Sequence, residues 1–196
     1  VGAGGTLNLG GGIAGPGTAN PNFNFSGDGT INLSNGTFTN NSSTSKTATY
    51  GNAVINLTSG THAITPGNNA GANISGTTRN VTYNLSGGTL TLNGSGTSPT
   101  VANTHLGIGN TTGTAFVSTL NVSSGTMNVG TTASTSGEIQ IAKTGSSNGT
   151  LNVTGGTVTV GTGATDNKIY FFKAGSNPGY TANMTQSGGT VTANGI

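Results

Sequence analysis

The chain has 196 residues, the length of one domain, and its five Lys and Arg against three Asp and Glu leave a formal net charge of +2. So few basic residues exclude the clustered Lys and Arg of a nucleic-acid-binding surface, and no apolar run approaches the ~20 residues of a membrane helix, so we expect neither nucleic-acid binding nor membrane insertion. The 37 Gly and 4% charged residues suggest low complexity, but disordered chains usually combine low hydrophobicity with high net charge, which is absent here.

One short motif recurs along the whole chain: an apolar-Asn-apolar run, then Ser or Thr with Gly, then a second alternating run. A partial copy stands at residues 7–12. Further copies lie at 31–39, 55–61, 83–92, 120–129 and 151–160, with a looser one at 184–192. The Gly residues of successive copies are 24 to 37 residues apart. Intervals of this size suit one turn of a solenoid with two or three strands.

Within each copy, apolar and polar residues alternate on both sides of the Gly, which is the period of a half-buried strand. Gly supplies the positive φ angles that a tight corner between two such strands requires. The longer intervals leave room for a third strand, which we place at residues 106–108, 139–141 and 169–171, with 23–25 in the same role earlier. Parallel crossover connections are overwhelmingly right-handed. The sequence therefore predicts an all-β fold, a single right-handed parallel β-helix (β-solenoid) of roughly seven turns with two to three strands per turn, covering 1–196.

The alternation also predicts which residues face outward. The apolar positions Leu33, Leu57, Leu85, Val122 and Val153 are expected to form one inward column. A one-residue slip would bury every intervening Asn, so the register is well specified. Two outward ladders follow, one of Asn32, Asn56, Asn84, Asn121 and Asn152, the other of Thr37, Thr89, Thr157 and Thr190.

The segment from Leu151 to Gly161, with the other copies of the motif, resembles the autotransporter-associated β-strand repeats of passenger-type β-helix proteins. The resemblance covers most of the chain. It implies an exported β-helix with a surface, adhesive or scaffolding role, and it carries no catalytic residues. A charge-poor composition rich in Thr, Asn, Ser and Gly is likewise typical of extracellular fibrous proteins. We therefore expect an extracellular or cell-surface location.

The acidic residues are too few and too dispersed for an acid/base or metal-binding cluster, being only Asp28, Glu138 and Asp166. By repeat alignment Glu138 falls opposite Lys168, with His105 one turn earlier in the same column. This column favours exposed cross-strand pairing over a catalytic site. No site is expected to combine two carboxylates, or a carboxylate and a histidine, in catalytic geometry.

Other polar residues give no stronger signal. Neither His62 nor His105 has an acidic or Cys neighbour at metal-ligand spacing. Lys143 and Lys173 share a column one turn apart, which favours a solvated face over an anion-binding site. We accordingly predict no enzyme activity, no cofactor and no metal.

Three functions remain open. The first is an extracellular structural role, in which bare end turns stack head to tail with copies of the same chain; a chain cut from a longer solenoid is the competing explanation of those ends. The second is an adhesin passenger segment that presents its Asn and Thr ladders to a glycan or host surface. The third is ice binding through a Thr-x-Thr column, which Thr61/Ala63 and Thr126/Asn128 interrupt. The candidate end-interface residues are Leu7, Leu9, Phe23, Phe25, Phe171, Phe172, Val191 and Ile196.

Overall fold

The computed structural model describes residues 4–10, 13–14, 24–41, 48–65, 71–76, 79–93, 103–109, 116–131, 136–143, 147–161, 167–173, 175 and 178–196. Every regular element among them is a β-strand, and the 16 strands belong to one continuous sheet. All the strand pairs are parallel. The predicted all-β class is confirmed, and parallel pairing throughout agrees with a β-helix. No helix long and apolar enough to span a bilayer occurs among the described residues.

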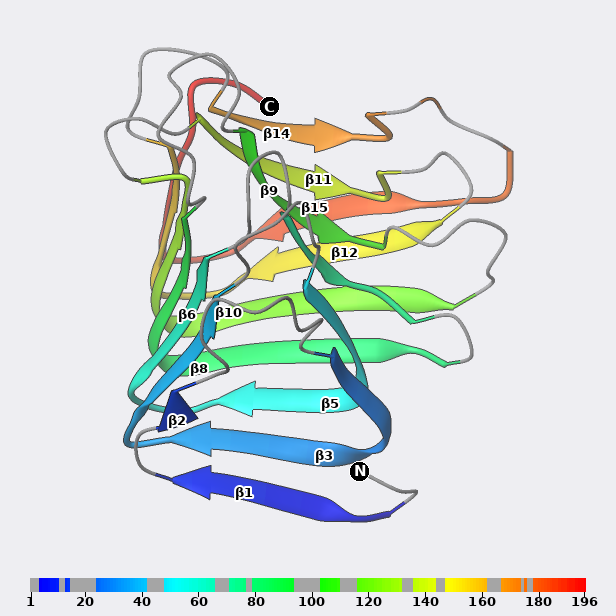
Figure 1. Ribbon diagram of the computed structural model, residues 1–196. Helices are drawn as coiled ribbons and strands as arrows, with labels where there is room; N and C mark the ends of the chain where they lie inside the picture. Colours follow the sequence, from blue (N-terminus) through cyan, green and yellow to red (C-terminus); the bar gives the residue numbers. More distant parts are fainter. Residues whose placement is uncertain are drawn as a thin grey trace.

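The first ladder of strands contains the apolar-Asn-apolar half of each repeat. It consists of β1 (Thr6–Gly10), β3 (Asn24–Ser34), β5 (Ala48–Leu57), β8 (Val81–Leu92), β10 (Val117–Val129), β12 (Asn148–Val153) and β15 (Ala182–Gln186). These strands stack from the bottom of the view to the top, in chain order (Figure 1). Equivalent repeat positions pair directly, so the register follows the motif and not the variable length between motifs.

Two further ladders run beside the first (Figure 1). The second contains the half of each repeat that follows the Gly: β2 (Ile13–Ala14), β4 (Thr37–Asn41), β6 (Thr61–Thr65), the later parts of β8 and β10, β13 (Thr157–Val160) and β16 (Thr190–Thr192). The third contains the early parts of β3 and β5, then β7 (Gly71–Ile74), β9 (Asn103–Ile108), β11 (Ser136–Ile141) and β14 (Lys168–Phe171). The strands predicted within the longer intervals are present in this third ladder.

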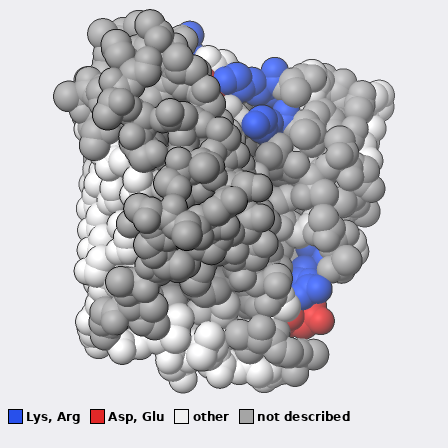
Figure 2. Space-filling view, viewed as in Figure 1, with Lys and Arg blue, Asp and Glu red and all other residues white. Residues whose placement is uncertain are grey.

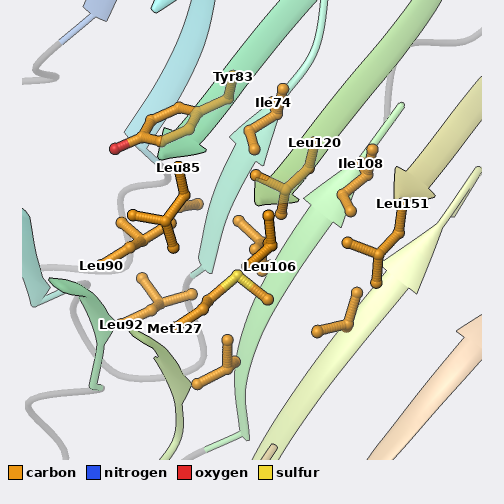
Figure 3. Close-up of a cluster of buried hydrophobic side chains, with 14 of the residues drawn as sticks. Ile74, Tyr83, Leu85, Leu90, Leu92, Leu106, Ile108, Leu120, Met127 and Leu151 are labelled. Carbon is orange, nitrogen blue, oxygen red and sulfur yellow. The ribbon is translucent and has the colours of Figure 1, made fainter. Parts of the chain in front are cut away.

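The core consists of apolar columns contributed by all three ladders. Leu33, Leu57, Leu85, Val122 and Val153 occupy one column and are fully buried. Side chains from the other ladders belong to the same cluster, in which Met127 lies beside Leu106 and Leu90 beside Leu85 (Figure 3). Each such side chain stabilises the fold by about 1.5–3 kcal/mol through burial. A thin core therefore suffices, because each turn adds one slice to it.

The repeat Gly forms a stacked corner between the first two ladders. Gly60, Gly88, Gly125, Gly156 and Gly189 all have positive φ, between 68° and 81°. A Cβ added at any of them would lie only 2.3–2.6 Å from the carbonyl oxygen of the Gly one turn earlier. Two separate requirements, the backbone angle and the close approach of successive turns, therefore exclude side chains at this corner.

We expect Gly156→Ala to lower the free energy of unfolding by about 3 kcal/mol or more, because it combines a left-handed backbone angle with a collision against Gly125 O. Gly179→Ala is the matched control: Gly179 also has positive φ (89°), but no atom lies within 4 Å of an added Cβ. That variant should lose only about 1–2 kcal/mol. Urea unfolding followed by circular dichroism measures both. Equal losses of unfolding free energy in the two variants would show that the close approach of successive Gly corners adds nothing to stability.

Candidate functional site

The predicted outward Asn residues form a continuous ladder of side-chain hydrogen bonds. The Nδ2 group of each Asn donates to Oδ1 of the Asn one turn earlier, at 2.7–2.9 Å. The ladder consists of Asn8, Asn32, Asn56, Asn84, Asn121 and Asn152. In the last described turn the Thr185 hydroxyl donates to Asn152 Oδ1 at 2.6 Å. Each bond contributes about 1 kcal/mol net, and each amide inside the ladder uses one of its two N–H donors and one lone pair of its oxygen for it.

The Thr residues of the second ladder lie in two outward columns. The first column is Thr at every described turn and contains Thr37, Thr61, Thr89, Thr126, Thr157 and Thr190. The second column, two residues further along each strand, is interrupted by Ala63 and Asn128. The interruptions foreseen from the sequence therefore fall in one column only. These side chains are exposed or half-buried, and the strand residues around them carry no Lys, Arg, Asp or Glu.

The outward face of the third ladder is charged. Half of the Lys, Arg, Asp, Glu and His residues of the chain gather there. His105, Glu138 and Lys168 are register partners on β9, β11 and β14, as the repeat alignment predicted. The prediction that this column is exposed is wrong, however, since Glu138 is only 2% exposed. Lys173 forms an ion pair with this buried carboxylate.

Glu138 is held by two donors on the outer face of β11. Gln140 Nε2 donates to Glu138 Oε2 at 2.5 Å, and Lys173 Nζ forms an ion pair with the same oxygen. The Lys173 ammonium also lies 4.7 Å from the centre of the Tyr170 ring, within cation–π range. Gln140 is itself 3% exposed, and its Oε1 atom has no hydrogen-bond partner.

Two left-handed corners bring the lysines to this place. Ala142 and Phe172 have φ of 52° and 51°, an angle unusual for residues other than Gly. Each follows the last residue of its strand, and Lys143 and Lys173 come next in the chain. Basic side chains accordingly gather at the upper end of the molecule, where β11 and β14 lie (Figure 2).

His105 and Lys143 form the second half of this cluster. Lys143 Nζ lies 3.5 Å from His105 Nε2. Burial, and then the nearby positive charge of Lys143, lower the pKa of His105 from 6.5 to about 4. Burial, and then Lys173, lower the pKa of Lys143. Glu138 and His105 are neighbours in register, but each forms its hydrogen bond with a different group.

The remaining acidic residues lie apart from this cluster. Asp28, which precedes the buried part of β3, forms an ion pair with Arg79 at 2.7 Å. Asp166 lies outside the described residues. Among the residues that the structure describes, no group of three His, Asp or Glu is placed to hold a metal ion.

His62 occupies the inward column of the second ladder, between Phe38 and Leu90 in register. It is buried, and its Nδ1 atom lies 2.7 Å from the Tyr83 hydroxyl, with the two rings stacked. Burial lowers the pKa of His62 from 6.5 to about 4. A neutral imidazole bonded to a phenol satisfies both polar groups inside an apolar column, so the role of His62 is structural.

Acid should therefore destabilise the fold well above the pH at which its carboxylates titrate. A lowered His pKa means that the unfolded chain takes up a proton near pH 6.5 and the folded chain only near pH 4, so stability falls as the pH drops through this window. Between pH 7.5 and pH 5 we expect each of His62 and His105 to remove about 2 kcal/mol.

The test is urea unfolding at both pH values. The double variant His62→Leu/Tyr83→Phe replaces the buried polar pair with apolar groups and should roughly halve the acid effect, while His105→Gln removes the other half. If both variants lost as much stability between pH 7.5 and pH 5 as the parent chain, the two histidines would not be the cause of that loss.

The candidate end-interface residues differ in their surroundings. Leu7 and Phe171 are 39% and 38% exposed, although their register partners Ile31 and Ile141 are buried. Leu9 and Val191 pack partly against the core, Phe172 is half-buried, and Ile196 is 78% exposed. Phe23 lies outside the described residues. Phe25 belongs to β3 and pairs with Tyr50, but its side chain lies outside the described part of the structure.

No family model matches the sequence, and searches of curated proteins and of solved structures give no match.

Proposed function

We propose that the chain is a non-catalytic extracellular structural protein, a β-solenoid subunit that assembles end to end into a fibre or cell-surface scaffold. In this proposal residues 1–196 form one closed, right-handed β-helix of about seven turns, with two to three strands per turn. The partner at each end is a second copy of the same chain.

The observation that carries the proposal is the repetition of the ladders, in which the motif positions pair in register outside the shifts near Ser124 and between Gly27 and Thr30. The same interactions join every described turn to the next: parallel strand pairing, the buried apolar columns and the Asn ladder. A rod built in this way is stiff, because bending it would break several of these contacts at once. The ladder of Asn amides adds a side-chain hydrogen bond from each of these repeats to the next.

The same interactions would form a joint between copies. Leu7 is 39% exposed at the β1 end of a column whose next member, Ile31, is 1% exposed. A strand of the adjoining copy that paired with β1 would bury Leu7, as pairing on both sides buries Ile31 within the chain. Following the direction of the ladder, Asn8 would donate to the Thr185 hydroxyl of the adjoining copy. Contacts of this kind do not close on themselves and therefore give an open filament.

The sequence resemblance to autotransporter-associated β-strand repeats supports the same conclusion. Repeats of that kind belong to exported proteins with surface, adhesive or scaffolding roles. We infer from it, and from the charge-poor surface, that this chain acts outside the cell or on its surface.

Negative-stain electron microscopy of the purified chain should show unbranched filaments of uniform width. Leu7→Lys places a charge in the column at the joint and should leave single short rods. Thr154→Lys is the matched control: it adds the same charge at an exposed position after β12, which is not a terminal strand of the ladder, and should leave filaments intact. Circular dichroism verifies that both variants fold. Single particles at every concentration of the parent chain, or equal effects of the two variants, would overturn end-to-end assembly.

Ice binding is the second candidate function, and one observation favours it. The first Thr column is unbroken over all its described turns, from Thr37 to Thr190. Parallel pairing spaces its hydroxyl and methyl groups regularly, about 4.8 Å apart along the column. A regular, uncharged array of this kind matches an ordered lattice better than it matches a flexible ligand.

Thermal hysteresis of ice growth tests this candidate. Thr126→Lys puts a charge in the middle of the unbroken column and should abolish hysteresis. Thr119→Lys, on the same strand but in the outward row of the first ladder, should leave it unchanged. The absence of any hysteresis in the parent chain would eliminate ice binding.

A further inference from the structure

The stacked corner between β3 and β4 differs in sequence from the corners that follow it. It reads Asn35-Gly36, whereas the later corners read Ser-Gly or Gly-Gly. Asn35 is exposed and has a left-handed φ of 56°, which Asn adopts more readily than most residues. Gly has no side chain to shield its backbone nitrogen. The corner therefore places an exposed electrophile, the amide carbon of Asn35, next to an unshielded nucleophile, the nitrogen of Gly36.

The hydrogen bonds of this corner engage the side-chain oxygen of Asn35 and leave its amide nitrogen unengaged. Ser59 Oγ, one turn later, donates to Asn35 Oδ1 at 2.9 Å and accepts from Asn35 N at 3.0 Å. Neither Asn35 Nδ2 nor Gly36 N forms a hydrogen bond with any residue that the structure describes. The Asn residues of the ladder differ in this respect, because their Nδ2 groups hold successive turns together.

Asn148-Gly149 has the same two residues in a protected setting. Asn148 is only 8% exposed, and its Oδ1 atom accepts from Thr181 N at 2.8 Å and from Thr181 Oγ1 at 3.1 Å. The nitrogen of Gly149 donates to Thr181 O at 2.9 Å. Attack of this nitrogen on the Asn148 amide would first require these bonds to break. The fold therefore separates two sites that are identical in sequence.

The other two Asn-Gly pairs in the sequence begin at Asn93 and Asn194. Asn93 is half-buried, and its Oδ1 atom accepts from Thr131 N at 2.9 Å. Asn194 N donates to Asn167 O at 2.7 Å, which fixes the main chain at that point. Both residues are thus held by a bond to the main chain of another strand or connection, and we expect both to react more slowly than Asn35.

We propose that Asn35-Gly36 is a site of spontaneous deamidation. Gly36 N loses its proton and attacks Asn35 Cγ, a succinimide ring closes, and the side-chain nitrogen leaves as ammonia. Water then adds to either ring carbonyl. Breaking the bond from Gly36 N to Cγ gives aspartate, and breaking the bond from Gly36 N to the main-chain carbonyl carbon of residue 35 gives isoaspartate. This modification goes beyond the structural role proposed above and does not depend on filament assembly.

The two products differ in their effect on the corner. Aspartate keeps an oxygen that can accept from Ser59 Oγ. Isoaspartate adds a methylene group to the main chain, at a corner so closely stacked that a Cβ built on Gly60 would lie 2.3 Å from Gly36 O. Isoaspartate should therefore destabilise the stacking of this corner, whereas aspartate should leave it nearly unchanged.

The test is peptide mapping by mass spectrometry of the full chain, kept folded in mildly alkaline buffer, with the same chain unfolded in urea as the reference. In the folded chain we expect Asn35 to convert about tenfold faster than Asn148, because the bonds of Asn148 must break first. Asn93 and Asn194 should also be slower than Asn35. In urea the four sites should convert at similar rates. Conversion of any of the others as fast as Asn35 in the folded chain, or an intact Asn35 after the unfolded chain has converted, would overturn the proposal.

Variants assign the reaction to this corner. Asn35→Gln keeps an amide but lengthens the side chain, so ring closure becomes much slower and the mass change of this peptide should disappear. A mass change that persisted in Asn35→Gln would place the reaction elsewhere and overturn the assignment. Asn35→Asp should unfold at nearly the temperature of the parent chain, and the isoaspartate fraction of aged protein at a lower one. Equal unfolding temperatures for these two products would refute the effect on stacking.

Discussion

Parallel, in-register pairing of each repeat with the next is the interaction on which the rest of this structure depends. The repeats begin 24 to 37 residues apart, yet equivalent positions pair directly in every described turn. Alternation enforces this register, because a slip by one residue would bury the Asn ladder and expose the apolar columns. The difference in length between repeats lies in the third ladder and in the connections, outside the motif.

Stacking of identical positions turns small local preferences into long continuous features. One Gly per repeat becomes a corner in which each turn approaches the next to within the space that a Cβ would need. One Asn per repeat becomes a chain of hydrogen-bonded amides, which polarise one another and share a common direction. Departures from the repeat have partners in the stack as well: His62 stands in an apolar column, and the hydroxyl of Tyr83, from the first ladder, lies 2.7 Å from its Nδ1 atom.

The outer face of the third ladder does not repeat in this way. Strand residues there differ from turn to turn, and the left-handed corners at Ala142 and Phe172 direct two lysines back toward the sheet. Polar groups that are buried but incompletely paired are costly, so a fold keeps them where a ligand or a further contact completes them.

The sequence by itself determined the repeat, its register and the side of the sheet on which each residue stands. Those properties depend on strand alternation and on Gly at the corner, which are local. It also placed His105, Glu138 and Lys168 in one column. Only the tertiary structure decided that Glu138 is buried, that Lys173 and not Lys168 neutralises it, and that Gln140 keeps an unpaired oxygen. The partner of Glu138 is 35 positions away in the sequence, and no local pattern encodes that pairing.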